Sequence, residues 1–327
     1  MRFVNPEPDR KLSIAPMLDI TTRHFRRLAR ILAPHALLYT EMVPTPALAH
    51  GRPEGFLFHT LEEQPLALQI GGSDTRECAL SARMAADAGF CEINLNCGCP
   101  SRRVHSGNFG ACLMKDPNQV VDIIRAMKDA APNLPATVKC RLGVDDHDTE
   151  EHLFSFIRTV ADAGCNTFII HARKAFLKNM SPAKNRTIPT LRRAAVYRVK
   201  DAFPELEIII NGDLRTAQDV MAQFPHVDGV MVGRVAYEAP MALAEMEHAL
   251  FGTPLPASHK EVVATFLPYM EEEVATGTRL FDMARHLMGL YAGQPGARLF
   301  RQRIAATVQD HAITPKDILD ACPPPHS

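Results

Sequence analysis

The sequence has 327 residues, of which 46% are hydrophobic and 22% charged, and its formal net charge at pH 7 is -1. This is the composition of a soluble globular protein, and the length allows one large domain with a small one beside it. A net charge so close to zero excludes a diffuse positive field as the means of attracting nucleic acid. No apolar run approaches the length of about eighteen residues that a membrane span needs, and the amino terminus is polar, so we expect no signal peptide and a cytoplasmic location.

The eight cysteines are scattered along the chain rather than grouped. Cys97 and Cys99 are separated by one residue, but no second pair follows at the spacing of a zinc site. Several of the others fall inside apolar runs. The pattern predicts reduced thiols, with neither a disulfide framework nor a metal site.

Short apolar runs alternate with stretches of helical character through the first three quarters of the chain. The runs span residues 11–17, 37–42, 65–72, 91–96, 135–141, 167–171, 206–211 and 227–232. Thr21 or Thr22 is expected to cap a helix that continues to Leu32, and Asp74 to cap one that ends at Ala88. Further helices are expected over 118–130, up to Ala163, and after the polar segment 172–189.

Eight such runs, each followed by a helix, predict a closed (β/α)₈ TIM barrel. The runs are almost continuously apolar, as the strands of a parallel sheet covered on both faces are. The barrel is predicted to occupy residues 1–252. After a proline-containing linker at 253–256 the remainder contains helical patterns only, so 253–327 is predicted to be a small all-helical domain.

The stretch 92–101, EINLNCGCPS, combines a buried strand with a turn. Asn94 and Asn96 are two residues apart and therefore lie on one face of the strand. The glycine and proline that follow end the strand and leave Cys99 at its carboxyl end, where barrel enzymes place their chemistry. A buried structural cysteine is the alternative for any single thiol, but the flanking polar residues favour a site.

A distinctive residue ends each of the predicted strands, and in all but the first strand it is polar. In chain order they are Pro16 with Met17, Glu41, Gln69, Asn96, Lys139 with Arg141, His171, Asn211 and Arg234. Barrels commonly bind a phosphate after strands seven and eight, where this chain has Asn211–Gly212–Asp213 and Gly233–Arg234. Lys139 and His171 could then meet a polar ring of the same ligand. The combination suggests flavin mononucleotide (FMN), although other phosphorylated ligands use the same end of the barrel.

At this level of detail the sequence resembles the tRNA-dihydrouridine synthases, and among them the A subfamily. The matching segments are APML (15–18), LLYTEMV (37–43), ALQIGGSD (67–74), EINLNCGCPS (92–101), FGACLM (109–114), VKCRLGVDD (138–146), FIIHARKA (168–175), the asparagine, arginine, isoleucine and proline of 185–189, and DGVMVGR (228–234). They keep the family's order and spacing up to about residue 252. Beyond that point the likeness is confined to GARLFR (296–301).

The resemblance implies a role for particular residues. Cys99 matches the proton donor of the family. The positions that match flavin contacts are Pro16, Met17, Leu18, Gln69, Lys139, His171, Asn211, Gly212, Asp213, Gly233 and Arg234. Those that match tRNA contacts are Asn96, Arg186, Arg298 and Arg301.

The chain departs from the family pattern at one flavin position. The usual Asn-Gly-Gly is Asn-Gly-Asp here, so Asp213 brings a carboxylate near the expected phosphate. A backbone N–H contact to the phosphate would survive this change, but the carboxylate could weaken flavin affinity. Cys97 is a second thiol close to Cys99, and its side chain is expected to point the same way. We interpret Cys97 as a packing residue.

The resemblance also implies the reaction. The C5–C6 bond of a D-loop uridine in tRNA, at positions 20 and 20a by analogy, would receive a hydride from FMN reduced by NADPH and a proton from Cys99. The base must leave its stack to reach the barrel, and contacts to the tRNA body must offset that cost. Arginines on the helical domain and the barrel rim are the expected contacts. Neither a membrane nor a protein partner is indicated.

Two other functions remain open from the sequence. A flavin-dependent barrel reductase of a small molecule would share the strand ends, but it would not need the helical domain or the arginines at 298–303. A non-catalytic RNA-binding protein would not need Cys99, Lys139 and His171. Comparing turnover of free uridine with that of unmodified tRNA distinguishes the first alternative from a tRNA-modifying enzyme. Flavin bound to the purified protein would argue against the second.

Overall fold

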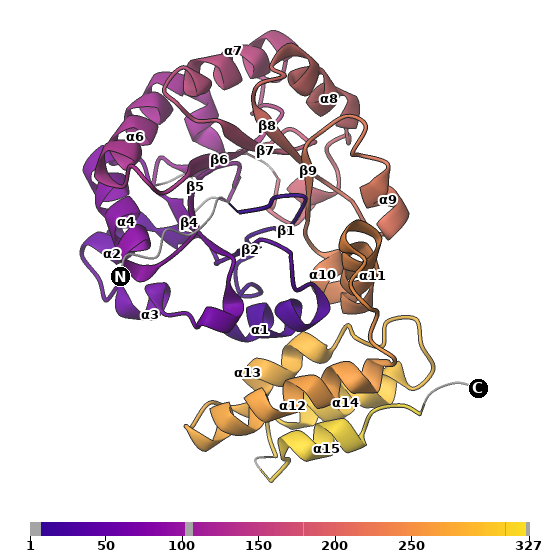
Figure 1. The fold of residues 1–327 in the computed structure, drawn as a ribbon. Helices are drawn as coiled ribbons and strands as arrows, with labels where there is room; N and C mark the ends of the chain where they lie inside the picture. The colour runs from indigo at the N-terminus through magenta and orange to yellow at the C-terminus, as the bar shows by residue number, and fades with distance from the viewer. Residues whose placement is uncertain (1–7, 102–106, 179, 311, 325–327) are drawn as a thin grey trace.

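A closed barrel of short parallel strands forms the centre of the computed structural model, which describes residues 8–101, 107–178, 180–310 and 312–324 (Figure 1). The strands are β1 (Leu12–Ile14), β2 (Leu38–Tyr39), β3 (Val43–Pro44), β4 (Leu66–Gly71), β5 (Glu92–Cys97), β6 (Ala136–Arg141), β7 (Thr167–His171), β8 (Glu207–Asn211) and β9 (Gly229–Val232). They are ordered β1-β9-β8-β7-β6-β5-β4-β2 in the sheet. A parallel bridge between Ser13 and Leu37 joins the two ends and closes the ring.

Each of the eight predicted apolar runs contains one barrel strand, so the predicted (β/α)₈ fold is confirmed. The additional strand, β3, was not predicted from the sequence. It extends the barrel wall beyond β2 and pairs with the carboxyl end of β4, where Val43 faces Ile70. The wall on this side is therefore taller than the two residues of β2 alone would make it.

Alternate residues of the strands face the helices and the barrel interior, as the pleat requires. On β5, Ile93 and Leu95 belong to the large apolar core shared with the helices. Asn94 and Asn96, on the other face, are hydrogen-bonded to polar side chains of the neighbouring strands inside the barrel. The expectation that these two asparagines share a face is confirmed.

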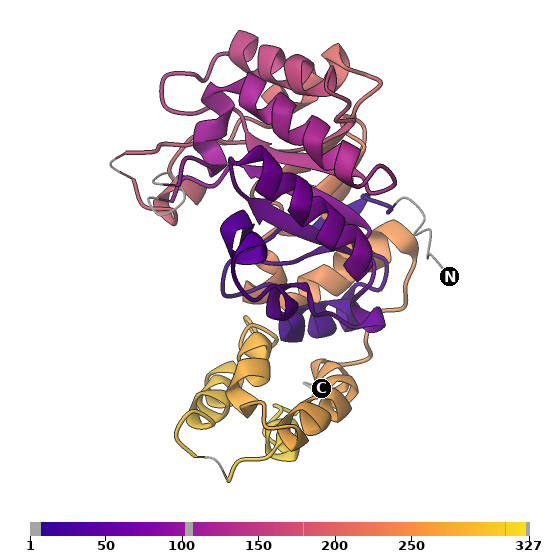
Figure 2. The same cartoon turned by 90° about the vertical axis from the view of Figure 1, so that its left-hand side faces the viewer.

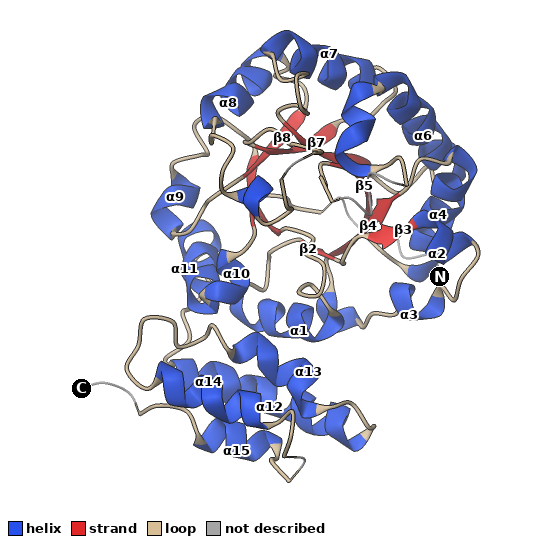
Figure 3. Cartoon of the chain, turned by 180° about the vertical axis from the view of Figure 1, so that it is seen from behind, coloured by secondary structure: helices blue, strands red, loops and turns tan. Residues whose placement is uncertain are grey.

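Helices cover the outside of the barrel, where Figure 3 shows them in blue around the red strands. They are α1 (Arg23–Leu32), α2 (Thr45–Ala49), α3 (Glu54–Leu57), α4 (Thr75–Ala88), α6 (Pro117–Ala130), α7 (Glu150–Ala161), α8 (Arg193–Ala202), α9 (Ala217–Met221), α10 (Val235–Glu238) and α11 (Pro240–Phe251). Thr22 and Asp74 cap α1 and α4 as predicted. Within the described ranges, none of the helices has both the length and the apolar character to cross a membrane.

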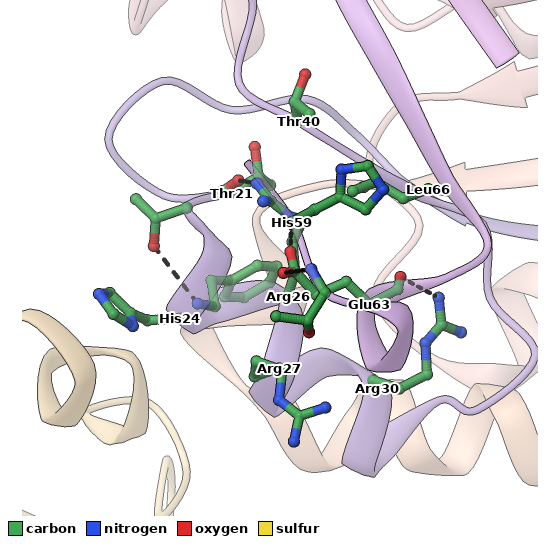
Figure 4. A network of polar contacts seen from close by, with 12 residues as sticks. Thr21, His24, Arg26, Arg27, Arg30, Thr40, His59, Glu63 and Leu66 are labelled. Carbon is green, nitrogen blue, oxygen red and sulfur yellow. Dashed lines mark hydrogen bonds and ion pairs between the residues drawn. The ribbon is translucent and has the colours of Figure 1, made fainter. Parts of the chain in front are cut away.

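A buried ion pair ties α1 to the segment before β4 (Figure 4). The Nε of Arg26 lies 2.6 Å from the Oε2 of Glu63, and both side chains are almost completely buried. Arg30, one turn later, donates to the backbone oxygens of Glu63 and Pro65. Because buried charges of this kind must be paired, the position of α1 on the barrel is closely defined.

A group of helices follows α11 and packs beside the barrel, as seen in Figure 2. It consists of α12 (His259–Ala275), α13 (Leu280–Ala284), α14 (Ala297–Ala306) and α15 (Pro315–Asp320). Many of its contacts with the barrel are made on α1. Arg23 forms a bidentate ion pair with Glu273 of α12, and the Nδ1 of His24 lies 2.7 Å from the hydroxyl of Tyr269. These contacts hold the helices next to the loop that leads from β1 into α1.

Candidate active site

A cavity of about 760 Å³ opens at the carboxyl ends of the barrel strands. This volume lies within the range of roughly 300–1,000 Å³ that small-molecule and cofactor sites occupy. Its lining includes these residues singled out from the sequence: Pro16, Met17, Leu18, Gln69, Asn96, Cys99, Lys139, His171, Arg186, Asn211, Gly212, Asp213, Gly233 and Arg234. Residues that are far apart in the sequence, from Pro16 to Arg234, therefore line the same cavity.

Cys99 lies on the β5 side of the cavity, in a loop whose backbone is hydrogen-bonded to side chains of β5 and β6. The Oδ1 of Asn96 accepts hydrogen bonds from the backbone N–H groups of Gly98, at 3.0 Å, and Cys99, at 2.9 Å. The Nε of Arg141 donates to the carbonyl oxygen of Gly98 at 3.2 Å. The Cys99 side chain is partly exposed to the cavity, while its backbone is fixed on both sides of Gly98.

Cys97 does not share this environment, contrary to the expectation that the two thiols point the same way. It is fully buried in the core beneath the helices and is not part of the cavity lining. The chain turns at Gly98, so the two-residue alternation of the strand does not extend to Cys99. The burial of Cys97 agrees with a packing role.

Lys139 on β6 and His171 on β7 lie side by side in the cavity wall. The Nζ of Lys139 lies 3.1 Å from the Oδ1 of Asn211, whose amide donates to the carbonyl oxygen of Met231. Burial, and then the nearby Arg141, lower the pKa of Lys139 to about 8. Burial and the same arginine hold the pKa of His171 well below its usual range, so its imidazole is neutral at pH 7.

The loops after β8 and β9 form a site suited to an anion. Asp213 has a φ of +51°, a left-handed conformation that a glycine adopts more easily, which accounts for the glycine of the family pattern. Its carboxylate lies 3.0 Å from Arg215, 3.7 Å from Arg234 and 3.9 Å from Arg173. Arg215 also lies 3.5 Å from the carboxylate of Glu238, so three guanidinium groups are set against two carboxylates and the cluster keeps a net positive charge.

Two of the arginines expected to contact RNA lie elsewhere. Arg298 and Arg301 are exposed on α14, outside the cavity lining. Neither forms an ion pair with Asp310 or with another residue in the described part of the chain. Arg186, in contrast, is exposed at the rim of the cavity itself.

The structure adds residues that the sequence did not single out for the site. Arg141 was recognised at the end of its strand but given no role, and it connects the Cys99 loop to the carbonyl oxygen of Asn185 at 2.8 Å. Arg173 and Arg215 join the anion site. Their signal was weak because each follows a strand by one or more residues, where arginines are usually only solvated. No cluster of three or more metal-ligating side chains occurs within the described ranges.

Comparison with known proteins agrees with this geometry. The family model "Dihydrouridine synthase (Dus)" matches residues 13–321. The tRNA-dihydrouridine(20/20a) synthase of Shewanella oneidensis is 48% identical over 298 residues, which cover 91% of this chain and 88% of that protein. The proteins of the same name from Vibrio cholerae and Pseudomonas syringae pv. tomato are 47% and 45% identical, covering 90% and 96% of this chain and 90% and 94% of theirs.

Solved structures of low sequence identity share the fold. Morphinone reductase in complex with tetrahydroNAD aligns with a TM-score of 0.54 at 12% identity, over 81% of this chain and 92% of that one. A 2-naphthoyl-CoA reductase complex aligns with a TM-score of 0.56 at 10% identity, over 75% of this chain and 50% of that one. The family match and the sequence identities, not these structures, decide the relationship. The chain belongs to the dihydrouridine synthase family.

Proposed function

We propose that this chain is an FMN-dependent tRNA-dihydrouridine synthase that uses NADPH to reduce the C5–C6 bond of D-loop uridines at positions 20 and 20a. The observation that carries the proposal is that one cavity is lined by Cys99, by Lys139 and by Arg234 of the arginine group around Asp213. The names of the relatives supply the substrate and the positions. For a protein with this substrate we propose a cytoplasmic location.

The residues present fit a flavin phosphate and a polar flavin ring. Gly212, with a φ of +135°, and Gly233 leave backbone accessible beside Arg234, and the three guanidinium groups around Asp213 keep the region positive. Lys139 would contact the N1–C2=O edge of the ring, where reduced flavin carries its negative charge. When bound and reduced, FMN would supply the hydride that C6 of the uracil accepts.

Cys99 supplies the proton that C5 receives. A thiol is one of the side-chain groups that can act as a general acid when it is positioned next to the reacting atom. Its backbone is fixed by Asn96 and, through Gly98, by Arg141, which limits the positions that the thiol can take. Such restriction of the reacting groups contributes substantially to the rate of a bimolecular step.

The helical region gives the site access to a large substrate. A second cavity of about 390 Å³ shares Glu41 and Phe56 with the first and reaches Asp282 and Arg285 of the helical region. The Nη2 of Arg285 donates to the backbone oxygen of Asp19 at 2.6 Å, next to the cavity lining. We therefore divide the chain into a catalytic barrel, 1–252, and a tRNA-binding helical domain, 253–327. A substrate the size of free uridine would not need this second space.

The decisive experiment compares substrates and cysteine variants. The purified protein, loaded with FMN and given NADPH, should form dihydrouridine in unmodified tRNA at positions 20 and 20a and leave free uridine unreacted. Cys99→Ala should keep FMN and its reduction by NADPH but lose most dihydrouridine formation, because the proton donor is gone. Cys97→Ala is the matched control and should remain active. Turnover of free uridine at the rate of tRNA, or full activity of Cys99→Ala, would overturn the assignment.

A further inference from the structure

A buried carboxylate lies inside the barrel, at the end opposite to the cavity. Glu92, the first residue of β5, is completely buried. Its Oε2 is 2.7 Å from the Nε of Arg10, and its Oε1 accepts from the hydroxyl groups of Tyr39, at 2.5 Å, and Thr137, at 2.7 Å. Burial, and then Glu92, raise the pKa of Tyr39 far above its usual range, so the phenol remains a donor.

A line of hydrogen bonds runs from this carboxylate to the Cys99 loop. The Nδ2 of Asn94 donates to the Oγ1 of Thr137 at 2.8 Å. The Nε2 of Gln69 donates to the Oδ1 of Asn94 at 2.8 Å, and the Nδ2 of Asn96 donates to the Oε1 of Gln69 at 2.9 Å. The Oδ1 of Asn96 accepts from the backbone N–H groups of the loop. Along β5 the line covers about 13 Å, at about 3.3 Å per residue.

All the donors in this line point the same way. A carboxylate accepts only, so the Thr137 hydroxyl must donate to Glu92 and can then only accept from Asn94. The amide of Asn94 therefore turns its oxygen to Gln69, and the same constraint passes through Gln69 to Asn96. The oxygen of Asn96 is left facing the loop, as the two backbone N–H groups require.

This arrangement is unusual for a barrel interior. Barrels of this kind fill their interior with layers of bulky apolar side chains. Here Gln69, Asn94, Asn96 and Thr137 are each at most 8% exposed, and each finds its partner in the line. A fully satisfied buried network is rigid, whereas reversal of one amide leaves like groups facing each other at both of its ends.

We propose that Glu92 and Thr137 are positioning residues for the proton donor, acting through the oriented amides of Asn94, Gln69 and Asn96. Neither residue belongs to the cavity wall, so their influence on Cys99 must pass through the line of hydrogen bonds. The proposal rests on the proposed function, because it takes Cys99 as the proton donor. It assigns to the far end of the barrel a role in the step in which tRNA is reduced.

Thr137→Val tests the line, because it keeps the shape of the side chain and removes the hydroxyl. Asn94 then loses its acceptor, and the amides above it are oriented from the loop end alone, by the backbone N–H groups of Gly98 and Cys99. In single-turnover reactions at saturating tRNA, reoxidation of reduced flavin should slow by about 10- to 100-fold, the loss expected when a reacting group is misplaced by about 1 Å. Reduction of the flavin by NADPH, which does not use Cys99, should stay within about twofold of the unaltered protein.

The controls separate positioning from general damage. Thr137→Ser restores the hydroxyl and should restore the rate. Tyr39→Phe removes another donor to the same Glu92 oxygen but lies outside the line, so it should lower stability without slowing the tRNA step. Thr137→Ala gives the same readout should the valine variant fail to accumulate.

The possible failures can be distinguished. If the unaltered protein does not form dihydrouridine in tRNA, the proposed function is wrong. If it does, the positioning role is overturned by a Thr137→Val rate equal to the unaltered rate. It is also overturned by equal slowing of both half-reactions, by equal slowing in Tyr39→Phe, or by a slow Thr137→Ser variant.

Discussion

Lys139→Met should make the flavin-free protein more stable and the flavin-loaded protein less competent. In the folded chain the pKa of Lys139 falls from 10.5 to about 8, chiefly because the ammonium is buried. At about 1.36 kcal/mol for each pKa unit, the fold disfavours the charged lysine by about 3 kcal/mol at pH 7. Methionine has a similar length and no charge. The lost hydrogen bond to Asn211 offsets about 1 kcal/mol, which leaves a net gain of about 2 kcal/mol.

The pH dependence of this gain follows from the direction of the pKa change. Between pH 8 and pH 10.5 the unfolded chain keeps the Lys139 proton that the folded chain has lost, so the stability of the unaltered protein rises with pH over this window. The advantage of the methionine variant should therefore be largest below pH 8 and nearly vanish by pH 10.5.

Urea unfolding of both flavin-free proteins at pH 7 and pH 10 measures these differences. Lys316→Met, at an exposed position of α15, is the control and should show no gain at either pH. A methionine variant at position 139 that is no more stable than the unaltered protein at pH 7, or whose gain does not shrink with pH, would refute the reasoning. With FMN bound, the same variant should have a flavin reduction potential lower by roughly 40 mV, because an interaction of about 2 kcal/mol with the reduced anion is lost.

Two further predictions concern the anion site and the exposed arginines of α14. Arg234→Ala should weaken FMN binding by about 10- to 100-fold, the effect of losing one charge-assisted hydrogen bond, whereas Asp213→Gly should strengthen it; fluorescence titration with FMN measures both. The double replacement of Arg298 and Arg301 by alanine should weaken tRNA binding and lower the slope of log K against log salt by roughly one for each lost phosphate contact, with flavin reduction by NADPH unchanged. An unaltered affinity and salt slope would indicate that these two arginines are only solvated.

The sequence was sufficient to predict the barrel because its strands are marked twice, by apolar runs and by the polar residues that end them. Lys139, His171 and Asn211 could be placed together because the carboxyl ends of parallel strands meet on one face. Strand β3 escaped prediction because a two-residue strand that contains a proline has no periodicity of its own. The direction of the Cys97 side chain was wrong because the turn at Gly98 interrupts the alternation of the strand.

The interior hydrogen-bond line could not be predicted for a different reason. Asn94 and Asn96 were recognised as sharing a face, but their partners come from other strands. Gln69 and Thr137 face Asn94 only in the register that the folded sheet adopts. A single sequence contains no information on the register between strands that lie tens of residues apart. Arg141 was missed in the same way, since its contacts are to backbone oxygens of two loops rather than to a recognisable motif.

The charges around the cavity suit it to an anionic ligand, although the chain as a whole is nearly neutral. Burial and mutual repulsion move the pKa values of Lys139 and His171 toward their uncharged forms. An anion in the cavity favours the charged form of Lys139, so binding of the anion and protonation of the lysine strengthen each other. Above pH 8, Lys139 must take up a proton from the solvent when the anion binds, so the affinity for the anion falls as the pH rises. An anionic ligand would therefore relieve the repulsion among these groups, so the groups that destabilise the free protein are those we expect to favour anion binding.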